Sequence, residues 1–248
     1  MRKALPLIAA GVAAFLVTLL AIAPASLVTT ILPSGVTLGM TSGTLWSGTA
    51  ESLTVQGQSL GGIRWKFLPL HLFRGRVAFD GELLRGDGQV RGRLALGLGG
   101  RYEARNLEIH LPLASLPPGI APRGWLGVVR AQLPSVQIPP APAVPKMLGT
   151  IELRGLQAPP PNGAPIGSYS VAFDAASAQA DKLVGQLKDL EGPMQVTGTV
   201  TLSAQRNYVI EGLIAPRAGA SQAVINTLRF LGPPDAQGRR PFSLAGTY

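Results

Sequence analysis

Residues 62–96 read GIRWKFLPLHLFRGRVAFDGELLRGDGQVRGRLAL, and their pattern indicates the fold class most clearly. Three pieces of it, residues 62–67, 76–80 and 90–96, alternate apolar side chains with polar or small ones. An alternation with a period of two residues is typical of a half-buried β-strand. Turn sequences such as Gly86-Asp87-Gly88 separate the pieces, and spacings of about ten residues leave no room for crossover helices. We therefore predict an antiparallel meander in a mainly β domain.

Patterns from the first half of the chain recur in the second half in the same order. Two recurrences share an offset of 106 residues and the third has an offset of 94. They are Gly43-Thr44-Leu45 with Gly149-Thr150-Ile151, residues 90–96 with residues 196–202, and Val77-Ala78-Phe79-Asp80 with Val171-Ala172-Phe173-Asp174. Short strand patterns also coincide by chance. If the repeat is real, two similar meanders, about 40–133 and 146–248, share one long sheet.

Two proline-rich tracts, residues 134–145 and 159–163, lie near the divide between these halves. Proline fixes an extended backbone that pairs poorly, so we expect loops or connections at a sheet edge there. A polyproline segment that binds another protein is the alternative.

One short helix is expected near the carboxyl end, from Ser221 to Leu231. Ser221 can cap its first turn, and Gly232-Pro233-Pro234 stops it. Its apolar side chains fall on one face, so the helix should lie against the sheet. These side chains are Val224, Ile225, Leu228 and Leu231.

The amino end carries a second, membrane-inserting helix. Between Lys3 and Glu51 there is no charged residue, and residues 5–23 are almost wholly apolar. As a helix this stretch reaches about 28 Å, close to the roughly 30 Å of a bilayer's hydrocarbon core. Basic residues precede it, so residues 1–4 should stay in the cytoplasm, residues 5–27 form an anchor, and residues 28–248 form an exported domain. A cleaved signal peptide is the alternative, and the length of the apolar stretch favours the anchor.

Composition supports a folded, cysteine-free β domain. The chain has 31 glycines and 22 prolines, with 14% charged and 46% hydrophobic residues, which is too apolar for disorder and suits short strands and turns. Cysteine is absent. A disulfide framework and a thiolate metal site are therefore excluded.

Positive charge is concentrated in the predicted strands between residues 64 and 105. The formal net charge is +9, and residues 64–105 alone hold nine basic and four acidic residues, a net +5. Outside the cytoplasm this excess fits anionic lipid head groups or an acidic protein surface, and not nucleic acid. An ordinary solvated strand face is the alternative. The candidate partner-binding basic face comprises Arg64, Arg74, Arg76, Arg91, Arg93, Arg101 and Arg105.

Signals for catalysis are weak. Gly57-Gln58-Ser59-Leu60-Gly61 has the form G-x-S-x-G, but an alternating strand follows it where a hydrolase has a helix. Only His71 and His110 are available as a base, and each sits in an apolar, strand-like run. No acidic or histidine pair has metal-ligand spacing, and no phosphate-binding glycine loop is present. We predict no catalytic residue, no metal and no cofactor.

Several short patterns occur along the exported domain: the run Ser42–Ala50, the tryptophan on the next strand, Leu190–Met194, and the carboxy-terminal Leu-Gly and Gly-Arg pairs. Taken together, these patterns resemble the protein N family of the bacterial type II, or general, secretion pathway. Two tryptophans about nineteen residues apart also suit one shared core, whatever the protein does. The family-motif and core residues are Gly43, Thr44, Leu45, Trp46, Gly48, Trp65, Gly192, Pro193, Gly232, Gly238 and Arg239.

This resemblance implies an accessory subunit of the secretion machine, anchored once in the cell inner membrane with its domain in the periplasm. Such a subunit would assist assembly or contacts between the inner-membrane platform and the outer-membrane secretin, for export of folded proteins. The family is also similar to AsmA-like proteins with long curved sheets, which implies an alternative: an apolar groove that carries lipid. Because charged residues alternate with small or apolar ones in residues 91–105, one face should be wet, which favours the scaffold.

Overall fold

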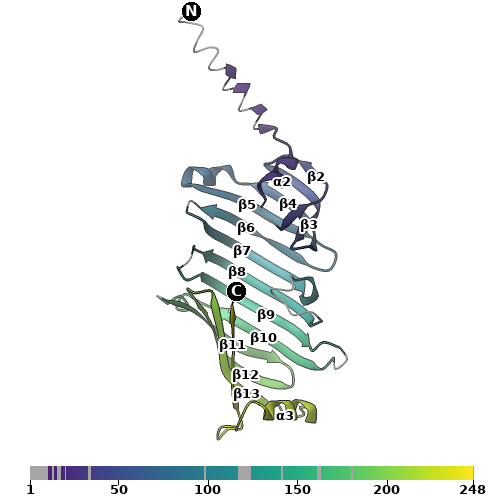
Figure 1. Cartoon of the computed structure of the whole chain (residues 1–248), viewed down its shortest axis with the longest axis vertical. Helices are drawn as coiled ribbons and strands as arrows, with labels where there is room; N and C mark the ends of the chain where they lie inside the picture. Colours follow the sequence, from purple (N-terminus) through teal and green to yellow (C-terminus); the bar gives the residue numbers. More distant parts are fainter. Residues whose placement is uncertain are drawn as a thin grey trace, which may run out of the picture.

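The computed structural model describes residues 11–12, 14–15, 18–19, 21–32, 35–97, 99–116, 124–140, 142–160, 163–179 and 181–247. Within these residues, fourteen strands form one antiparallel sheet (Figure 1). From β3 to β14 every strand lies beside its neighbour in the sequence. The prediction of a mainly β domain built on one long antiparallel meander is confirmed.

The strands vary from three to thirteen residues in length. They are β1 (Val36–Leu38), β2 (Thr41–Gly43), β3 (Ser47–Val55), β4 (Gln58–Phe67), β5 (Arg76–Leu84), β6 (Gln89–Gly97), β7 (Arg101–Pro112), β8 (Leu126–Ile138), β9 (Lys146–Gln157), β10 (Pro165–Phe173), β11 (Lys182–Glu191), β12 (Met194–Ser203), β13 (Asn207–Pro216) and β14 (Arg240–Thr247). The helical segments of the described residues are short: η1 (Ala25–Leu27), α2 (Val28–Ile31), η2 (Pro69–Arg74), η3 (Leu113–Ser115) and α3 (Gln222–Arg229).

The two edges of the sheet differ. At the amino-terminal edge, the short strands β1 and β2 pair with successive parts of β3. At the other edge, β14 pairs along its whole length with β13. The sheet therefore begins with a broken strand and ends with a continuous one.

One face of the sheet is apolar from end to end. Residues paired directly across antiparallel strands point to the same face. One such row crosses every strand from β3 to β14 and contains only apolar residues and glycine. Its members are Ala50, Ile63, Leu83, Val90, Ile109, Ala131, Ile151, Val171, Leu187, Gly198, Gly212 and Phe242.

The opposite face is polar along the same path. The next row points the other way, because successive residues of a strand alternate between faces. All of its members except one alanine are polar. They are Thr49, Arg64, Glu82, Arg91, Glu108, Gln132, Thr150, Ala172, Gln186, Thr199, Glu211 and Ser243.

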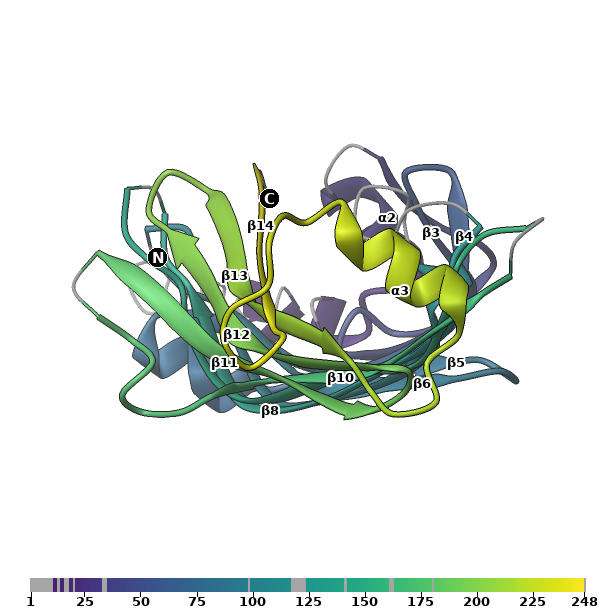
Figure 2. The same ribbon diagram turned by 90° about the horizontal axis from the view of Figure 1, so that it is seen from below.

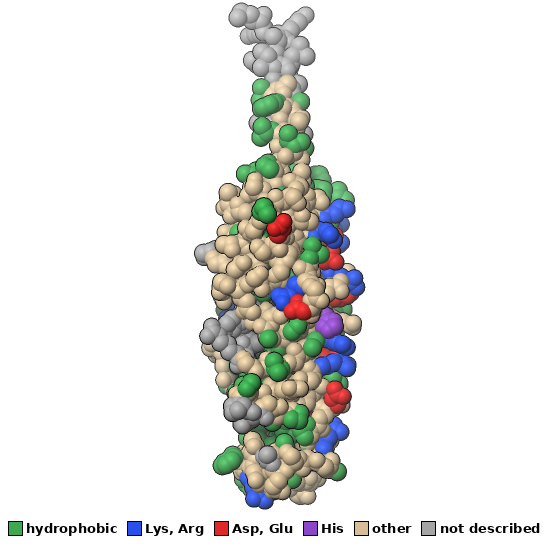
Figure 3. Space-filling model, turned by 90° about the vertical axis from the view of Figure 1, so that its right-hand side faces the viewer, with side chains coloured by type: hydrophobic (Ala, Val, Ile, Leu, Met, Phe, Trp, Pro, Cys, Tyr) green, Lys and Arg blue, Asp and Glu red, His purple; other side chains and the backbone are tan. Residues whose placement is uncertain are grey.

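The sheet is curved, and its apolar face is the concave one. Figure 2 shows the sheet as a trough, with α2, α3 and β14 on the inner side. Val28 of α2 packs against the buried cluster of Ala25, Ala50 and Trp65, so the inner side is the face that carries Trp65. A second buried cluster, Ala131, Leu133 and Val136, lies on the same face in β8. Figure 3 shows Lys, Arg, Asp and Glu along one long side of the molecule.

The predicted carboxy-terminal helix is present as α3. The Ser221 hydroxyl accepts a hydrogen bond from the Val224 N–H at 3.4 Å, so Ser221 is the N-cap as expected. Leu228 is buried, with 4% of its surface exposed, and the helix contacts β13. Leu231 lies two residues beyond the end of the helix and is exposed, so the apolar face is shorter than predicted.

The predicted cytoplasmic residues 1–4 and about half of the predicted anchor, residues 5–27, lie outside the described residues. Among the residues that the structure describes, no helix is both long enough and apolar enough to cross a membrane.

Two local expectations are wrong. Pro134 lies inside β8, where the pairing with β9 shifts register between Gln132 and Ser135, so the irregular backbone there accommodates the ring. His71 lies in the 3-10 helix η2 and not in a strand. Pro69 presets the helical φ at the start of η2, and Gly75, with φ +66°, ends it.

The sheet is continuous between the two proposed meanders, because β8 and β9 pair directly. The division at about residues 133–146 stays a prediction. In the recurring tetrapeptide, Phe79 in β5 and Phe173 in β10 both point into the trough.

Candidate functional site: two faces of one sheet

The concave face is a trough whose middle is open among the described residues. Several of its apolar side chains are exposed although they lie on the inner side of the sheet; Leu94 in β6, for example, is 53% exposed. Contiguous apolar surface of this kind marks a binding surface in soluble proteins. The exposed members are Val77, Leu94, Leu96, Tyr102, Ile138 and Leu244. The alternation in the sequence predicted that these side chains lie on the apolar face of the sheet. It did not predict whether a second layer of structure covers that face.

The convex face is charged, and its charges are paired across strands. Four of the seven residues of the predicted basic face form ion pairs with carboxylates on other strands; three pairs join adjacent strands, and Arg76 of β5 reaches across β6 to Glu103 of β7. The distances are 2.9 Å for Arg64 with Glu82, 2.7 Å for Arg76 with Glu103, 2.7 Å for Arg91 with Glu108 and 2.8 Å for Arg93 with Asp80. The hydrogen bond to Asp80 raises the pKa of Arg93 above its ordinary value. The face is therefore a mixed ladder and not a uniform cationic surface.

Arg74, Arg101 and Arg105 complete the predicted basic face. Within the described part of the chain, none of the three forms an ion pair. Arg101 and Arg105 belong to β7, and Arg74 ends η2. The unbalanced positive charge thus lies toward one end of the outer face.

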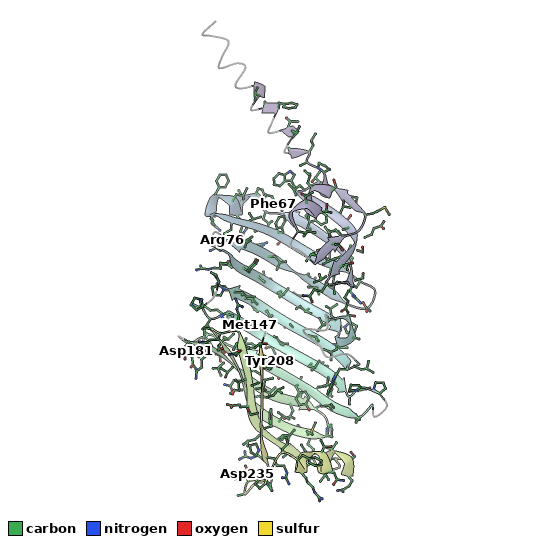
Figure 4. The ribbon with its side chains drawn as sticks, in the orientation of Figure 1. Phe67, Arg76, Met147, Asp181, Tyr208 and Asp235 are labelled. Atoms are coloured by element: carbon green, nitrogen blue, oxygen red, sulfur yellow. The ribbon has the colours of Figure 1, made fainter. Side chains whose placement is uncertain are left out.

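The first family-motif segment holds the amino end of the chain to the sheet. The Leu45 N–H donates to the Ala23 carbonyl at 2.8 Å, and Thr44 forms a β-bridge with Pro24. The Leu45 carbonyl accepts a hydrogen bond from Trp65 Nε1 at 3.1 Å. These contacts join the segment before the sheet to a buried side chain of β4, the strand that ends at Phe67 (Figure 4).

The two motif tryptophans lie in different surroundings. Trp65 is buried, with 7% exposed, and the glycine paired with it on β3, Gly48, leaves space for its ring. Trp46 is half-buried, and its ring centroid is 4.9 Å from that of Phe67. Gly43, at the end of β2, has φ +90°, which glycine adopts without strain.

The second motif segment lies where β11 turns into β12. Gly192 has φ +127°, and a Cβ there would lie 2.5 Å from Cα of Gly167, so the two backbones touch. The Pro193 carbonyl accepts the Arg217 N–H at 2.9 Å. The Arg217 guanidinium also pairs with Asp189, whose other oxygen accepts the Val196 N–H at 2.8 Å.

The last motif residues form the turn before β14. Asp235 Oδ1 accepts the backbone N–H groups of Gln237 and Arg239, and Oδ2 accepts Arg239 Nε, all at 2.9 Å. The Arg239 N–H, with the other donors, holds the pKa of Asp235 below its ordinary value. Gly238 has φ +76°, and the Gly232 carbonyl accepts a hydrogen bond from Arg240. These family-motif residues therefore stabilise the connection between α3 and β14.

The G-x-S-x-G sequence is the β3–β4 hairpin. Gln56 and Gly57 have φ values of +51° and +80°, as a two-residue hairpin turn requires, and Ser59 is exposed and paired with Thr54. His110 is exposed in β7. No group of three or more potential metal ligands occurs in the described ranges.

Comparison with known proteins identifies the family of this chain. The family model for type II secretion system (T2SS), protein N matches residues 34–243, which include thirteen complete strands and the first half of β14. The chain belongs to this family. Both faces of the sheet and all the motif residues named above fall within the matched range.

Curated relatives of the T2SS protein N family cover nearly the whole chain. Type II secretion system protein N of Aeromonas hydrophila is 29% identical over 259 residues, which is 99% of each chain. The protein of the same name from Vibrio cholerae is 28% identical over 87% of this chain and 86% of its own. That of Klebsiella pneumoniae is 28% identical over 95% and 93%. No solved structure matches significantly.

Proposed function

We propose that this protein is an accessory subunit of the type II secretion machinery, anchored once in the inner membrane with its sheet in the periplasm. It links the inner-membrane platform to the outer-membrane secretin, or assists their assembly, for export of folded proteins. Membership of the T2SS protein N family supports work with other secretion components. The proposal includes no catalytic step, cofactor or metal.

The observation that carries the scaffold role is the polar row on the convex face. It crosses twelve strands, and its central residues Arg91, Glu108 and Gln132 are exposed. Exposed ion pairs contribute about 0–1 kcal/mol each to stability, so the ladder is free to exchange its partners for those of another protein. Guanidinium groups pair with carboxylates in a fixed bidentate geometry, which favours a specific protein surface.

A second function is favoured by the trough. The apolar row on the concave face crosses twelve strands, and Leu94, Tyr102 and Leu244 in this face are exposed. Burial of apolar surface contributes about 25 cal/mol per Å². Acyl chains of a lipid laid along the trough would supply that burial. The alternative is therefore a periplasmic lipid-binding or lipid-transfer protein.

One pair of probes separates the two functions. A photo-crosslinking phenylalanine analogue replaces Gln132 on the convex face or Leu94 in the trough of the full chain, in cells that assemble the secretion machine. The scaffold predicts protein adducts from position 132, containing platform or secretin subunits, and none from position 94. The lipid carrier predicts lipid adducts from position 94, detected by mass spectrometry after purification.

A third probe, at Thr199, tests a remote point of the same polar row. If a stable, normally abundant chain gives no secretion-subunit adduct from position 132 or 199, the scaffold role is wrong. Lipid adducts at position 94 in that case establish the second function instead.

A further inference from the structure

The 3-10 helix η2 presents large apolar side chains to solvent. It connects β4 to β5 and packs against β5. Phe73 is 88% exposed and Leu70 is 75% exposed, and Leu72 between them is exposed as well. Single exposed apolar residues are normal on protein surfaces. Three within one six-residue helix form a compact apolar projection.

A small cavity with excess positive charge lies beside this projection. Its volume is ≈ 60 Å³. Two of its guanidinium groups are neutralised, Arg76 by Glu103 and Arg93 by Asp80. The cavity is lined by His71, Arg74, Arg76, Arg93, Ala95, Glu103 and Arg105.

Among the residues that the structure describes, three polar groups at this cavity have no ion-pair or hydrogen-bond partner. Arg74 and Arg105 have no carboxylate within ion-pair distance in the part of the chain that the structure describes. The Nδ1 atom of His71 is buried with no hydrogen-bond partner among the same residues. A buried polar atom without a partner is costly, and an oxyanion at the cavity would accept hydrogen bonds from all three side chains.

The projection lies at the end of the body from which the amino-terminal segment leaves. In Figure 1 the connection between β4 and β5 is at the top of the sheet, on the side of that segment. Figure 3 shows hydrophobic side chains next to Lys and Arg at the same end. The described residues Val12, Phe15, Leu19 and Ile22 of the segment are exposed and apolar.

We propose that η2 and the cavity beside it dock on an anionic bilayer, with Leu70, Leu72 and Phe73 in the interfacial layer and Arg74 and Arg105 bound to lipid phosphate. The inference rests on the inner-membrane location proposed above. Apolar and aromatic side chains combined with arginine are the composition that binds such interfaces. Docking at this second point holds the long axis of the sheet at a fixed angle to the membrane.

Spin labels test the docking in the full chain, which has no cysteine of its own. Leu70→Cys and Phe73→Cys carry the label at the projection, and Ser243→Cys carries it on β14 as the control. Each chain is reconstituted into vesicles of phosphatidylcholine alone or with phosphatidylglycerol. We expect the labels at 70 and 73 to become several-fold less accessible to a water-soluble nickel chelate in the anionic vesicles, while the control label stays accessible.

A charge variant tests the headgroup contact. Arg74→Glu with Arg105→Glu should return the label at position 70 to water in anionic vesicles. Arg130→Glu with Lys188→Glu makes the same change in charge elsewhere on the outer face, and should leave the label protected. If the chains co-float with the vesicles but the labels at positions 70 and 73 stay accessible to the nickel chelate, the docking is wrong and the membrane location stands. Equal protection of these labels in both lipid compositions would also contradict the docking alone. A chain that does not float overturns the proposed membrane location together with the docking.

Discussion

Trp65 leaves no space for a side chain at Gly48. A Cβ added at Gly48 would lie 2.5 Å from Cζ2 of Trp65 and 2.8 Å from the Ser42 carbonyl. The glycine on the other side of Trp65, Gly81, has different surroundings, because the nearest atom to its added Cβ is 4.0 Å away. Two glycines paired with the same tryptophan thus differ in how strongly the fold requires them.

We therefore predict that Gly48→Ala lowers the free energy of unfolding by about 1–3 kcal/mol, because the added methyl displaces a buried ring or its own strand. Gly81→Ala is the matched control and should change it by less than about 1 kcal/mol. Urea unfolding of both variants, followed by circular dichroism, measures the difference. Equal midpoints for the two variants would contradict the close packing.

Tyr169 gives the protein an alkaline sensitivity. Burial, with a contribution from Asp189, raises the pKa of its phenol to about 12. An unfolded tyrosine has a pKa of about 10, so between about pH 10 and 12 the unfolded chain has lost a proton that the folded chain retains. The free energy of unfolding must fall as the pH rises through this range.

Tyr169→Phe should accordingly flatten the decline of the melting temperature between about pH 10 and 12. The variant also loses the hydrogen bond from the phenol to the Ile166 carbonyl, which lowers stability equally at every pH below this range. Tyr102→Phe alters a phenol exposed in the trough and should keep the wild-type profile. A parallel decline in all three proteins would show that Tyr169 is not the group responsible.

At the scale of elements, alternation in the sequence predicted strands because each strand has one wet and one apolar side. It did not predict bulges, since these depend on the partner strand. Pro134 is tolerated only because β8 and β9 slip there, and the apolar residues around His71 form η2 because Pro69 and Gly75 bound them. The local sequence pattern therefore predicts which face of the sheet a residue lies on more reliably than it predicts which residue on the next strand lies opposite.

The candidate site was predictable to a similar extent. The arginines of the outer face could be identified from the sequence, but the sequence did not predict which of them form ion pairs with carboxylates. Arg91 lies opposite Glu108 only through the cross-strand register, which shifts between Arg91 and Arg93. The cavity beside η2 is lined by residues of four elements, η2, β5, β6 and β7, so the sequence could not predict it without the strand register.

Helix α3 is held to the sheet by one face. Leu228→Ala should cost about 2 kcal/mol or more and release the helix, because its side chain is 4% exposed. Phe230→Ala, at a side chain 91% exposed, should cost less than about 0.5 kcal/mol. Hydrogen exchange of the α3 amides, with the urea midpoint, distinguishes the two. Unchanged exchange in Leu228→Ala would mean that other contacts hold the helix.

We predict the membrane topology of the chain from its charge. Arg2 and Lys3 precede the apolar segment, so a reporter enzyme that is active only after export should be active when fused after Tyr248. Replacing both Leu16 and Leu20 with arginine should abolish that activity if residues 5–27 are the anchor that we predict, because an arginine near the centre of a membrane-spanning helix costs about 2.5–3.5 kcal/mol of insertion free energy. Activity of a cytoplasmic reporter at the same position would reverse the orientation.

The unbroken sequence order of the strands has a consequence for biogenesis. From β4 to β14 each strand pairs with the one made just before it, so most contacts between strands close a short loop; the connection through α3 between β13 and β14 is longer. Sheets built from such local pairings form faster than those that join distant segments. This sheet can therefore grow hairpin by hairpin in the order of synthesis, and each new strand covers the edge that the strand before it left open.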